Sequence, residues 1–172
     1  SVYKDKGFVN LLLNNALNES NLKPNDKGLV TNIVYGVLQN SMYLDYVIRH
    51  YCVDKKVDAR MRTLLKCAFY QMYFMDKIPN YALVNETVEI AKNELGLQAS
   101  KFANAVLNNA IRNPFTLKQS DFKDELSYLC MKYSHPEWLI RMIGKHYGMD
   151  KAMSYMKSNV TPPPLSLRVN TL

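Results

Sequence analysis

The sequence contains no long hydrophobic run, and this absence limits the classes of protein that it can encode. Its longest apolar stretch, Leu11-Leu12-Leu13 with its neighbours, is interrupted by asparagines, whereas a helix that spans a bilayer needs about 20 apolar residues. Residues 1–6 also lack the basic-then-apolar pattern that opens a secretory signal peptide. We therefore expect a cytoplasmic protein that binds no membrane.

Cysteine and glycine are also scarce. Cys52, Cys67 and Cys130 are odd in number and match no zinc-ligand spacing, so we expect buried thiols rather than disulfides or a metal site. The glycines are isolated, at positions such as 36, 96, 144 and 148, and form no Gly-rich loop that could cradle a phosphate. We therefore expect no catalytic residue, no metal and no cofactor within these 172 residues.

Helical periodicity runs along nearly the whole chain. Apolar residues recur at three- and four-residue spacing, which is typical of amphipathic helices. The predicted helices cover about residues 8–17, 26–39, a stretch from 41, a stretch after Asp58, 80–95, 98–113, a stretch from 121, 134–148 and 150–158. The sequence thus predicts an all-α fold, a helical bundle.

Several polar residues and glycines are placed where helices would begin or end. Ser41 and Asp58 suit N-caps, and Gly96 suits the end of the helix that starts at Asn80. Ser134 and Glu137 have the spacing of a capping box. We therefore expect helices to begin after Ser41, Asp58 and Ser134.

Residues 162–172 do not have the helical pattern of the rest of the chain. Pro162-Pro163-Pro164 cannot be helical, and Leu165, Leu167 and Val169 then alternate with polar residues. This alternation is typical of a β-strand, but a lone strand has no partner here. We therefore expect the chain to end just inside a further domain.

Two segments resemble the paired helices of the NusB family: PNYALVNETVEIAK at 79–92 and SKFANAVLN at 100–108. The residues Val34-Tyr35-Gly36-Val37 and Leu44-Asp45 also look like a helix pair of that family. The resemblance covers about residues 8–113 and implies a NusB-like helical bundle that binds RNA. Relatives usually begin with a further helix that carries many of the RNA contacts, and this sequence starts close to where that helix would end.

The segments 134–139 and 162–172 resemble the linker of the ribosomal RNA small subunit cytosine-5 methyltransferase B family, RsmB or Sun. This resemblance implies an RNA-binding, substrate-positioning domain of an S-adenosylmethionine-dependent enzyme that methylates cytosine C5 in 16S rRNA. It implies three parts: a NusB-like domain at 1–116, a helical linker at 117–160, and the start of the methyltransferase domain at 161–172. The cofactor and the catalytic cysteines would belong to that domain, because Cys52, Cys67 and Cys130 match neither of them.

The basic residues are the candidates for RNA contacts, since the formal net charge is +7 and an excess of base favours an anionic partner. Lys101, Asn104, Asn108 and Arg112 fall on one side of a predicted helix, in a stretch, 96–120, that holds no acid. Side chains at this spacing can meet successive phosphates and 2′-hydroxyls. The alternative interpretation is a solvated helix face.

A second basic cluster surrounds the start of the helix after Asp58: Lys55, Lys56, Arg60, Arg62 and Lys66. Asp54 and Asp58 neutralise it in part, and Asp58 is expected to pair with Arg62. A third group, Lys132, Arg141, Lys145, Lys151 and Lys157, lies nearer the C-terminus. Trp138 and Tyr147 occur within that third stretch, where core packing is favoured over base stacking.

Three functions remain open at this point. The first is the methyltransferase module, with 16S rRNA and its own C-terminal methyltransferase domain as partners and with no role for DNA. The second is a free-standing NusB-like transcription antitermination factor that binds RNA and a ribosomal protein. The third is a helical scaffold that binds only proteins. The tail from Pro162 favours the first over the second.

Overall fold

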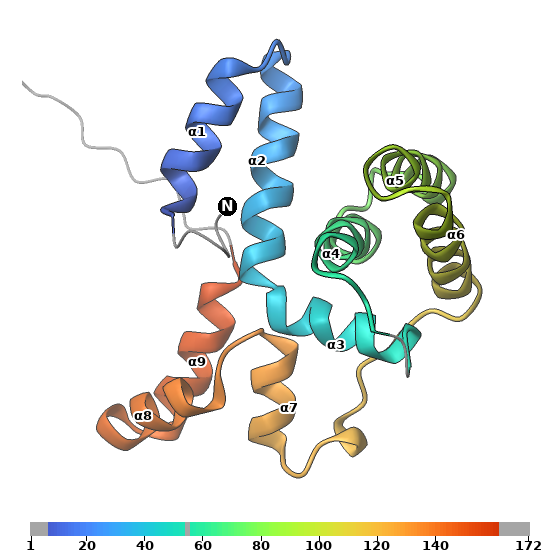
Figure 1. Ribbon diagram of the computed structural model, residues 1–172. Coiled ribbons are helices and arrows are strands. Elements are labelled where there is room, and N and C mark those ends of the chain that lie inside the picture. Colours follow the sequence, from blue (N-terminus) through green and yellow to red (C-terminus); the bar gives the residue numbers. More distant parts are fainter. Residues whose placement is uncertain (1–6, 54–55, 162–172) are drawn as a thin grey trace, which may run out of the picture.

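The computed structural model describes residues 7–53 and 56–161, and these residues form helices with no β-strand among them (Figure 1). The α-helices are α1 (Val9–Glu19), α2 (Pro24–Gln39), α3 (Ser41–Tyr51), α4 (Ala59–Phe74), α5 (Asn80–Leu95), α6 (Leu97–Arg112), α7 (Glu125–Lys132), α8 (Glu137–Tyr147) and α9 (Met149–Asn159), with a 3-10 turn, η1, at Gln119–Asp121. The predicted all-α class is confirmed. The strand predicted at 165–169 lies outside the described residues.

The first hydrophobic core is built by α2 to α6, with α4 packed against α2, α3 and α5. Phe69 and Leu65 of α4 are fully buried together with Leu44 of α3 and Leu107 of α6. These positions lie on the apolar faces that three- and four-residue spacing creates. The five helices are therefore held by one continuous set of side chains.

Local signals set most of the boundaries of these helices. The carboxylate of Asp58 accepts a hydrogen bond of 2.9 Å from the backbone N–H of Arg60, as an N-cap does. Gly96 has a φ of 93°, a left-handed value that glycine adopts without steric cost, and it separates α5 from α6. The predicted N-cap at Asp58 and helix end at Gly96 are confirmed.

Helices α2 and α4 approach each other closely at Gly36. A Cβ atom on Gly36 would overlap the phenol ring of Tyr70, and the hydroxyl of Tyr70 donates a 2.9 Å hydrogen bond to Oδ1 of Asn32. Glycine is therefore required at position 36 by packing, because any larger side chain would push the two helices apart.

A second, smaller core is formed by α7, α8 and α9 around Cys130, Ile140, Ala152 and Met156. Figure 1 shows these helices as a group beside the ends of α2 and α3. The helix predicted to begin at 121 begins later, at Glu125, because the carboxylate of Asp124 caps it by accepting from the N–H of Ser127 at 2.7 Å.

The predicted capping box of Ser134 and Glu137 is wrong. Helix α8 starts after Pro136 without a side-chain cap, and the hydroxyl of Ser134 instead accepts a 2.8 Å hydrogen bond from the backbone N–H of Met42. Ser134 thus caps α3, whose own N-cap residue, Asn40, makes no capping hydrogen bond with its side chain. This contact joins the second core to the first.

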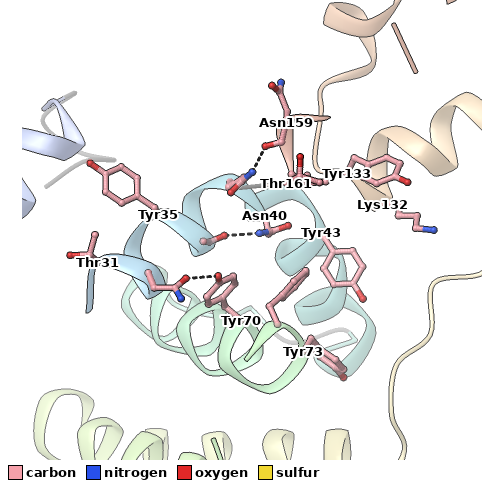
Figure 2. Close-up of a pocket in the computed structure, with 15 residues that line it drawn as sticks. Thr31, Tyr35, Asn40, Tyr43, Tyr70, Tyr73, Lys132, Tyr133, Asn159 and Thr161 are labelled. Carbon is pink, nitrogen blue, oxygen red and sulfur yellow. Dashed lines mark hydrogen bonds between the residues drawn. The ribbon is translucent and has the colours of Figure 1, made fainter. Parts of the chain in front are cut away.

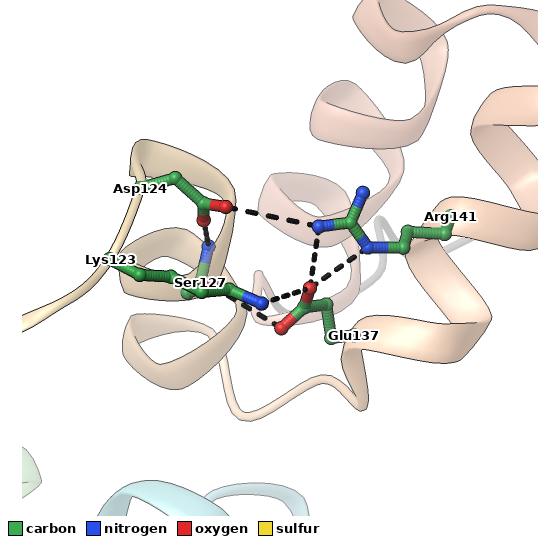
Figure 3. Close-up of polar contacts among 5 residues, drawn as sticks. All are labelled: Lys123, Asp124, Ser127, Glu137 and Arg141. Atoms are coloured by element: carbon green, nitrogen blue, oxygen red, sulfur yellow. Dashed lines mark hydrogen bonds and ion pairs between the residues drawn. The ribbon is translucent and has the colours of Figure 1, made fainter.

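Glu137 lies in a group of polar contacts that links α7 to α8 (Figure 3). Its carboxylate accepts hydrogen bonds from Arg141 at 2.6 and 2.8 Å, from Lys123 at 3.1 Å and from Ser127 at 3.3 Å. Arg141 also lies 3.8 Å from the carboxylate of Asp124. The hydrogen bonds from Arg141 and Lys123 lower the pKa of Glu137 from its ordinary value.

The contact between Gly36 and Tyr70 predicts opposite effects for two alanine substitutions in α2. Gly36→Ala should lower the free energy of unfolding by about 1–3 kcal/mol, because it overpacks a filled site. Gly28→Ala is the matched control: open space surrounds a Cβ atom there, so it should raise that free energy by about 0.4–1 kcal/mol. Urea unfolding of both variants measures the difference. Equal stability of the two variants would contradict the close packing.

The contacts of Glu137 predict a pH-dependent contribution to stability. Because its folded pKa is lowered, its contribution is present above the unfolded pKa and is lost as the pH falls through the folded pKa. Arg141→Gln should move the pKa of Glu137 upward, whereas Lys145→Gln, two turns away on α8, should leave it nearly unchanged. Carbon-detected NMR titration of the Glu137 carboxyl measures both. Equal pKa values in wild type and Arg141→Gln would show that the contact is not formed.

Candidate nucleic-acid interface

Four predicted RNA-binding residues lie along the outer side of α6: Lys101, Asn104, Asn108 and Arg112, named here the α6 stripe. The opposite side of α6 is buried through Ala103, Val106, Leu107 and Ala110. Lys101 and Arg112 are exposed, and neither forms an ion pair within the described part of the chain. At 1.5 Å per residue, these two cations are about 16 Å apart along the helix axis.

The two asparagines of the α6 stripe interact with each other. The side-chain amide of Asn108 donates to the backbone carbonyl of Asn104 at 2.9 Å and to its Oδ1 at 2.8 Å. The stripe is therefore an ordered row with a cation near each end and a fixed pair of amides between them. Such a row can meet phosphates with its cations and sugar hydroxyls with its amides.

The second predicted cluster is largely neutralised by acids. Arg60 forms an ion pair with Glu94 at 3.0 Å, and Arg62 lies 3.8 Å from Asp45. The predicted pair of Asp58 with Arg62 is not formed, because the carboxylate of Asp58 caps α4. Lys56 is exposed, while Lys55 lies outside the described residues. This cluster offers an anionic ligand less positive charge than its sequence suggests.

Lys66 is wrongly placed among the predicted RNA contacts. The residue is only 6% exposed, and its ammonium donates to Asp45 at 2.8 Å and to the hydroxyl of Ser41 at 2.7 Å. A buried ammonium needs such partners because its desolvation is costly. Lys66 therefore ties α4 to α3 and is not accessible to a phosphate. The prediction that Ser41 caps α3 is also wrong, because the N-cap position is Asn40 and the Ser41 hydroxyl accepts a hydrogen bond from Lys66.

The residues of the third basic group differ in whether an acid binds them. Arg141 is bound by Glu137, while Lys132, Lys145, Lys151 and Lys157 are exposed. The prediction that Trp138 and Tyr147 pack in the core is wrong, because each is 67% exposed. The second core contains Ile140 and Ile143 of α8 instead.

A cleft of about 770 Å³ lies where the second core meets the first (Figure 2). Its walls come from α2, α3 and α4 on one side and from the ends of α7 and α9 on the other. Aromatic rings, side-chain amides and one lysine line it: Tyr35, Tyr43, Tyr70, Tyr73, Phe74, Tyr133, Asn32, Gln39, Asn40, Asn159 and Lys132. The sequence pattern does not predict this cleft; the one signal in the sequence is the abundance of tyrosine, 12 residues.

Two phenols of the cleft wall are perturbed by their burial. Burial raises the pKa of both Tyr43 and Tyr70. Tyr43 and Phe74 contact edge to face with ring centroids 5.7 Å apart, and Phe74 stacks on Tyr70 at 5.3 Å. This part of the wall is thus an aromatic surface with polar hydroxyls and amides around it.

Gly36 and Gly148 have structural roles. Gly36 packs on Tyr70, and Gly148, with a φ of 90°, separates α8 from α9. Cys52 and Cys130 are buried, and burial raises the pKa of the Cys67 thiol. Over the described ranges, no group of three or more His, Cys, Asp or Glu side chains is placed to hold a metal, and no helix has the length and apolarity to cross a membrane.

Comparison with known proteins gives two matched ranges. Residues 2–112 match the NusB family, and residues 135–172 match the ferredoxin-like domain of the RsmF/B-like methyltransferases. Relatives include a probable ribosomal RNA small subunit methyltransferase B of Bacillus subtilis, 33% identical over 98% of this chain and 38% of the relative. The corresponding protein of Vibrio cholerae is 31% identical over 92% of this chain and 36% of its own length.

A transcription antitermination protein NusB of Acetivibrio thermocellus is 30% identical, over 58% of this chain and 71% of the relative. The methyltransferase relatives extend the similarity through α7 to α9, although the chain spans only about two fifths of their length. The NusB model itself matches well over half of the chain. The chain belongs to the NusB family, and its order of segments is that of the ribosomal RNA small subunit methyltransferase B relatives.

Proposed function

We propose that this chain is the RNA-binding, substrate-positioning part of an S-adenosylmethionine-dependent methyltransferase that modifies cytosine C5 in 16S rRNA. The observation that carries the proposal is the order of the two matched ranges, a NusB range at 2–112 followed by an RsmF/B-like range at 135–172. The second range supports this function over a free-standing antitermination factor, whose relative covers only 58% of the chain.

We propose the same three parts that the sequence predicts: a NusB-like domain at 1–116, a helical linker at 117–160 and the start of the catalytic part at 161–172. The second matched range begins at residue 135, inside the proposed linker. S-adenosylmethionine would supply the methyl group in the whole enzyme. Gly36 is used in packing and Gly96 and Gly148 lie at helix ends, and we propose that residues of the catalytic part hold that cofactor.

The α6 stripe is the proposed RNA surface of the chain. Lys101 and Arg112 are exposed on a helix without acidic residues, and the Asn104–Asn108 pair lies between them. Contacts from such side chains to phosphate and sugar position an RNA without reading its bases. Arg60 and Arg62 form a weaker secondary surface, because nearby acids already compensate their charge.

Charge reversal in the α6 stripe should weaken RNA binding and flatten its salt dependence. Each phosphate contact contributes about 0.7 to the log–log salt slope for single strands, so Lys101→Glu with Arg112→Glu should reduce the slope by at least about 1.4. The loss of affinity should be similar for two unrelated RNA hairpins, because phosphate contacts carry no base information. Fluorescence anisotropy at several salt concentrations measures both quantities.

The control is Lys23→Glu with Lys77→Glu, which makes the same change in net charge at exposed positions outside α6. A general loss of positive charge would weaken binding equally in the two double variants, and that result would remove the special role of the stripe. Unchanged affinity and salt slope in the α6 double variant would show that RNA binds at another surface, of which Lys56, Arg60 and Arg62 are the first candidates.

A further inference from the structure

The cleft between the two cores is separate from the α6 stripe and has no part in the contacts proposed for it. Its 770 Å³ lies within the range of about 300–1,000 Å³ that small-ligand sites occupy. This volume suits a few unpaired nucleotides and is too small for a duplex. The shape of the cleft therefore favours an extended or flipped-out ligand.

Aromatic faces are the main feature of the cleft. Tyr35, on α2, is 45% exposed, and Tyr133, just after α7, lines the cleft on its other side (Figure 2). Tyr43 and Phe74, which also line the cleft, contact each other edge to face. Flat rings with accessible faces are the surfaces on which unpaired bases stack.

Fixed amides supply hydrogen-bonding groups beside the rings. Asn40 is buried, and its Nδ2 donates to the carbonyl of Gly36 at 2.9 Å. Gln39 donates to the backbone carbonyl of Asn159, which lines the opposite wall. These bonds orient the amides, and the carbonyl and amide groups of Asn and Gln match the donors and acceptors on base edges.

The charge of the cleft also fits a nucleotide. Among the described residues that line it, Lys132 is the one charged residue and none carries a carboxylate. The Lys132 ammonium lies 5.7 Å from the ring centroid of Tyr133, so a cation stands beside one of the aromatic faces. A ligand with flat neutral groups and one nearby negative charge satisfies all three features.

A proline-rich peptide is the competing occupant, because aromatic grooves also bind polyproline helices. The lysine, the oriented amides and the lack of carboxylates favour nucleic acid over such a peptide, as does the chain's net charge of +7. We infer that the cleft between the two cores binds unpaired nucleotides of the RNA, with bases stacked on Tyr35 and Tyr133 and a phosphate near Lys132. The inference rests on the proposed RNA-binding function and adds the single-stranded character of the part bound here.

The test compares a single-stranded RNA with a duplex of the same length, using fluorescence anisotropy and the wild-type chain. Tyr35→Ala should weaken binding of the single strand at least about fivefold, the loss expected when one stacked base is released. It should leave duplex binding and the salt slope unchanged, since no phosphate contact is removed. Tyr81→Ala is the matched control, because Tyr81 is 74% exposed on α5 and does not line the cleft.

The outcomes separate the cleft from the α6 stripe. Equal affinity of Tyr35→Ala and Tyr81→Ala for the single strand overturns the cleft proposal, even if the α6 double variant loses binding. Displacement of single-stranded RNA by an oligoproline peptide, with no difference between the two tyrosine variants, would assign the cleft to the peptide. If Tyr35→Ala loses affinity for the single strand while the α6 double variant binds RNA normally, the cleft proposal is supported and the proposed role of the α6 stripe is overturned. No binding of either RNA by the wild type would overturn both proposals.

Discussion

The hydrogen bonds that Ser134 accepts from the amino end of α3 determine how the two cores are joined. The N–H groups of Met42 and Tyr43 lie 2.8 and 3.5 Å from its hydroxyl, and Asn40 provides no side-chain cap of its own. Ser134 has a φ of 56°, a left-handed value that is uncommon for a residue other than glycine. Glycine would relieve that backbone but would remove the hydroxyl. Together with the hydrogen bond from Gln39 to the carbonyl of Asn159, this contact joins the second core to the first beside the cleft.

The charges of the chain are distributed so that only part of the positive excess faces a ligand. Arg60 and Lys66 are bound by acidic side chains of other helices, and Arg141 is bound by Glu137 of its own helix and by Asp124, the N-cap of α7. Lys101 and Arg112 have no such partner among the described residues. The net charge of +7 therefore says less about the RNA surface than the positions of the few acids do. Lys66 shows this most clearly, because its ion pair with Asp45 of the neighbouring helix buries its charge.

The fold could be predicted from the sequence because its signals are local. Periodicity and residues such as Pro79, Gly96 and Pro114 place most helix boundaries within a few positions of those observed. The errors involve partners far apart in the sequence: Ser134 binds Met42 across 92 positions, and Lys66 binds Asp45 across 21. The cleft was missed for the same reason, since its walls come from helices that only tertiary packing brings together.

The account holds that one RNA contacts two surfaces, with phosphates on the α6 stripe and unpaired bases in the cleft. Photocrosslinking with an RNA hairpin that carries 4-thiouridine only in its loop, followed by mass spectrometry, tests this most directly. The account predicts adducts from the loop on the residues that line the cleft, at positions 31–43 and 132–133, and their absence from α5. Loop adducts confined to α6 or to the exposed Trp138 region would contradict it.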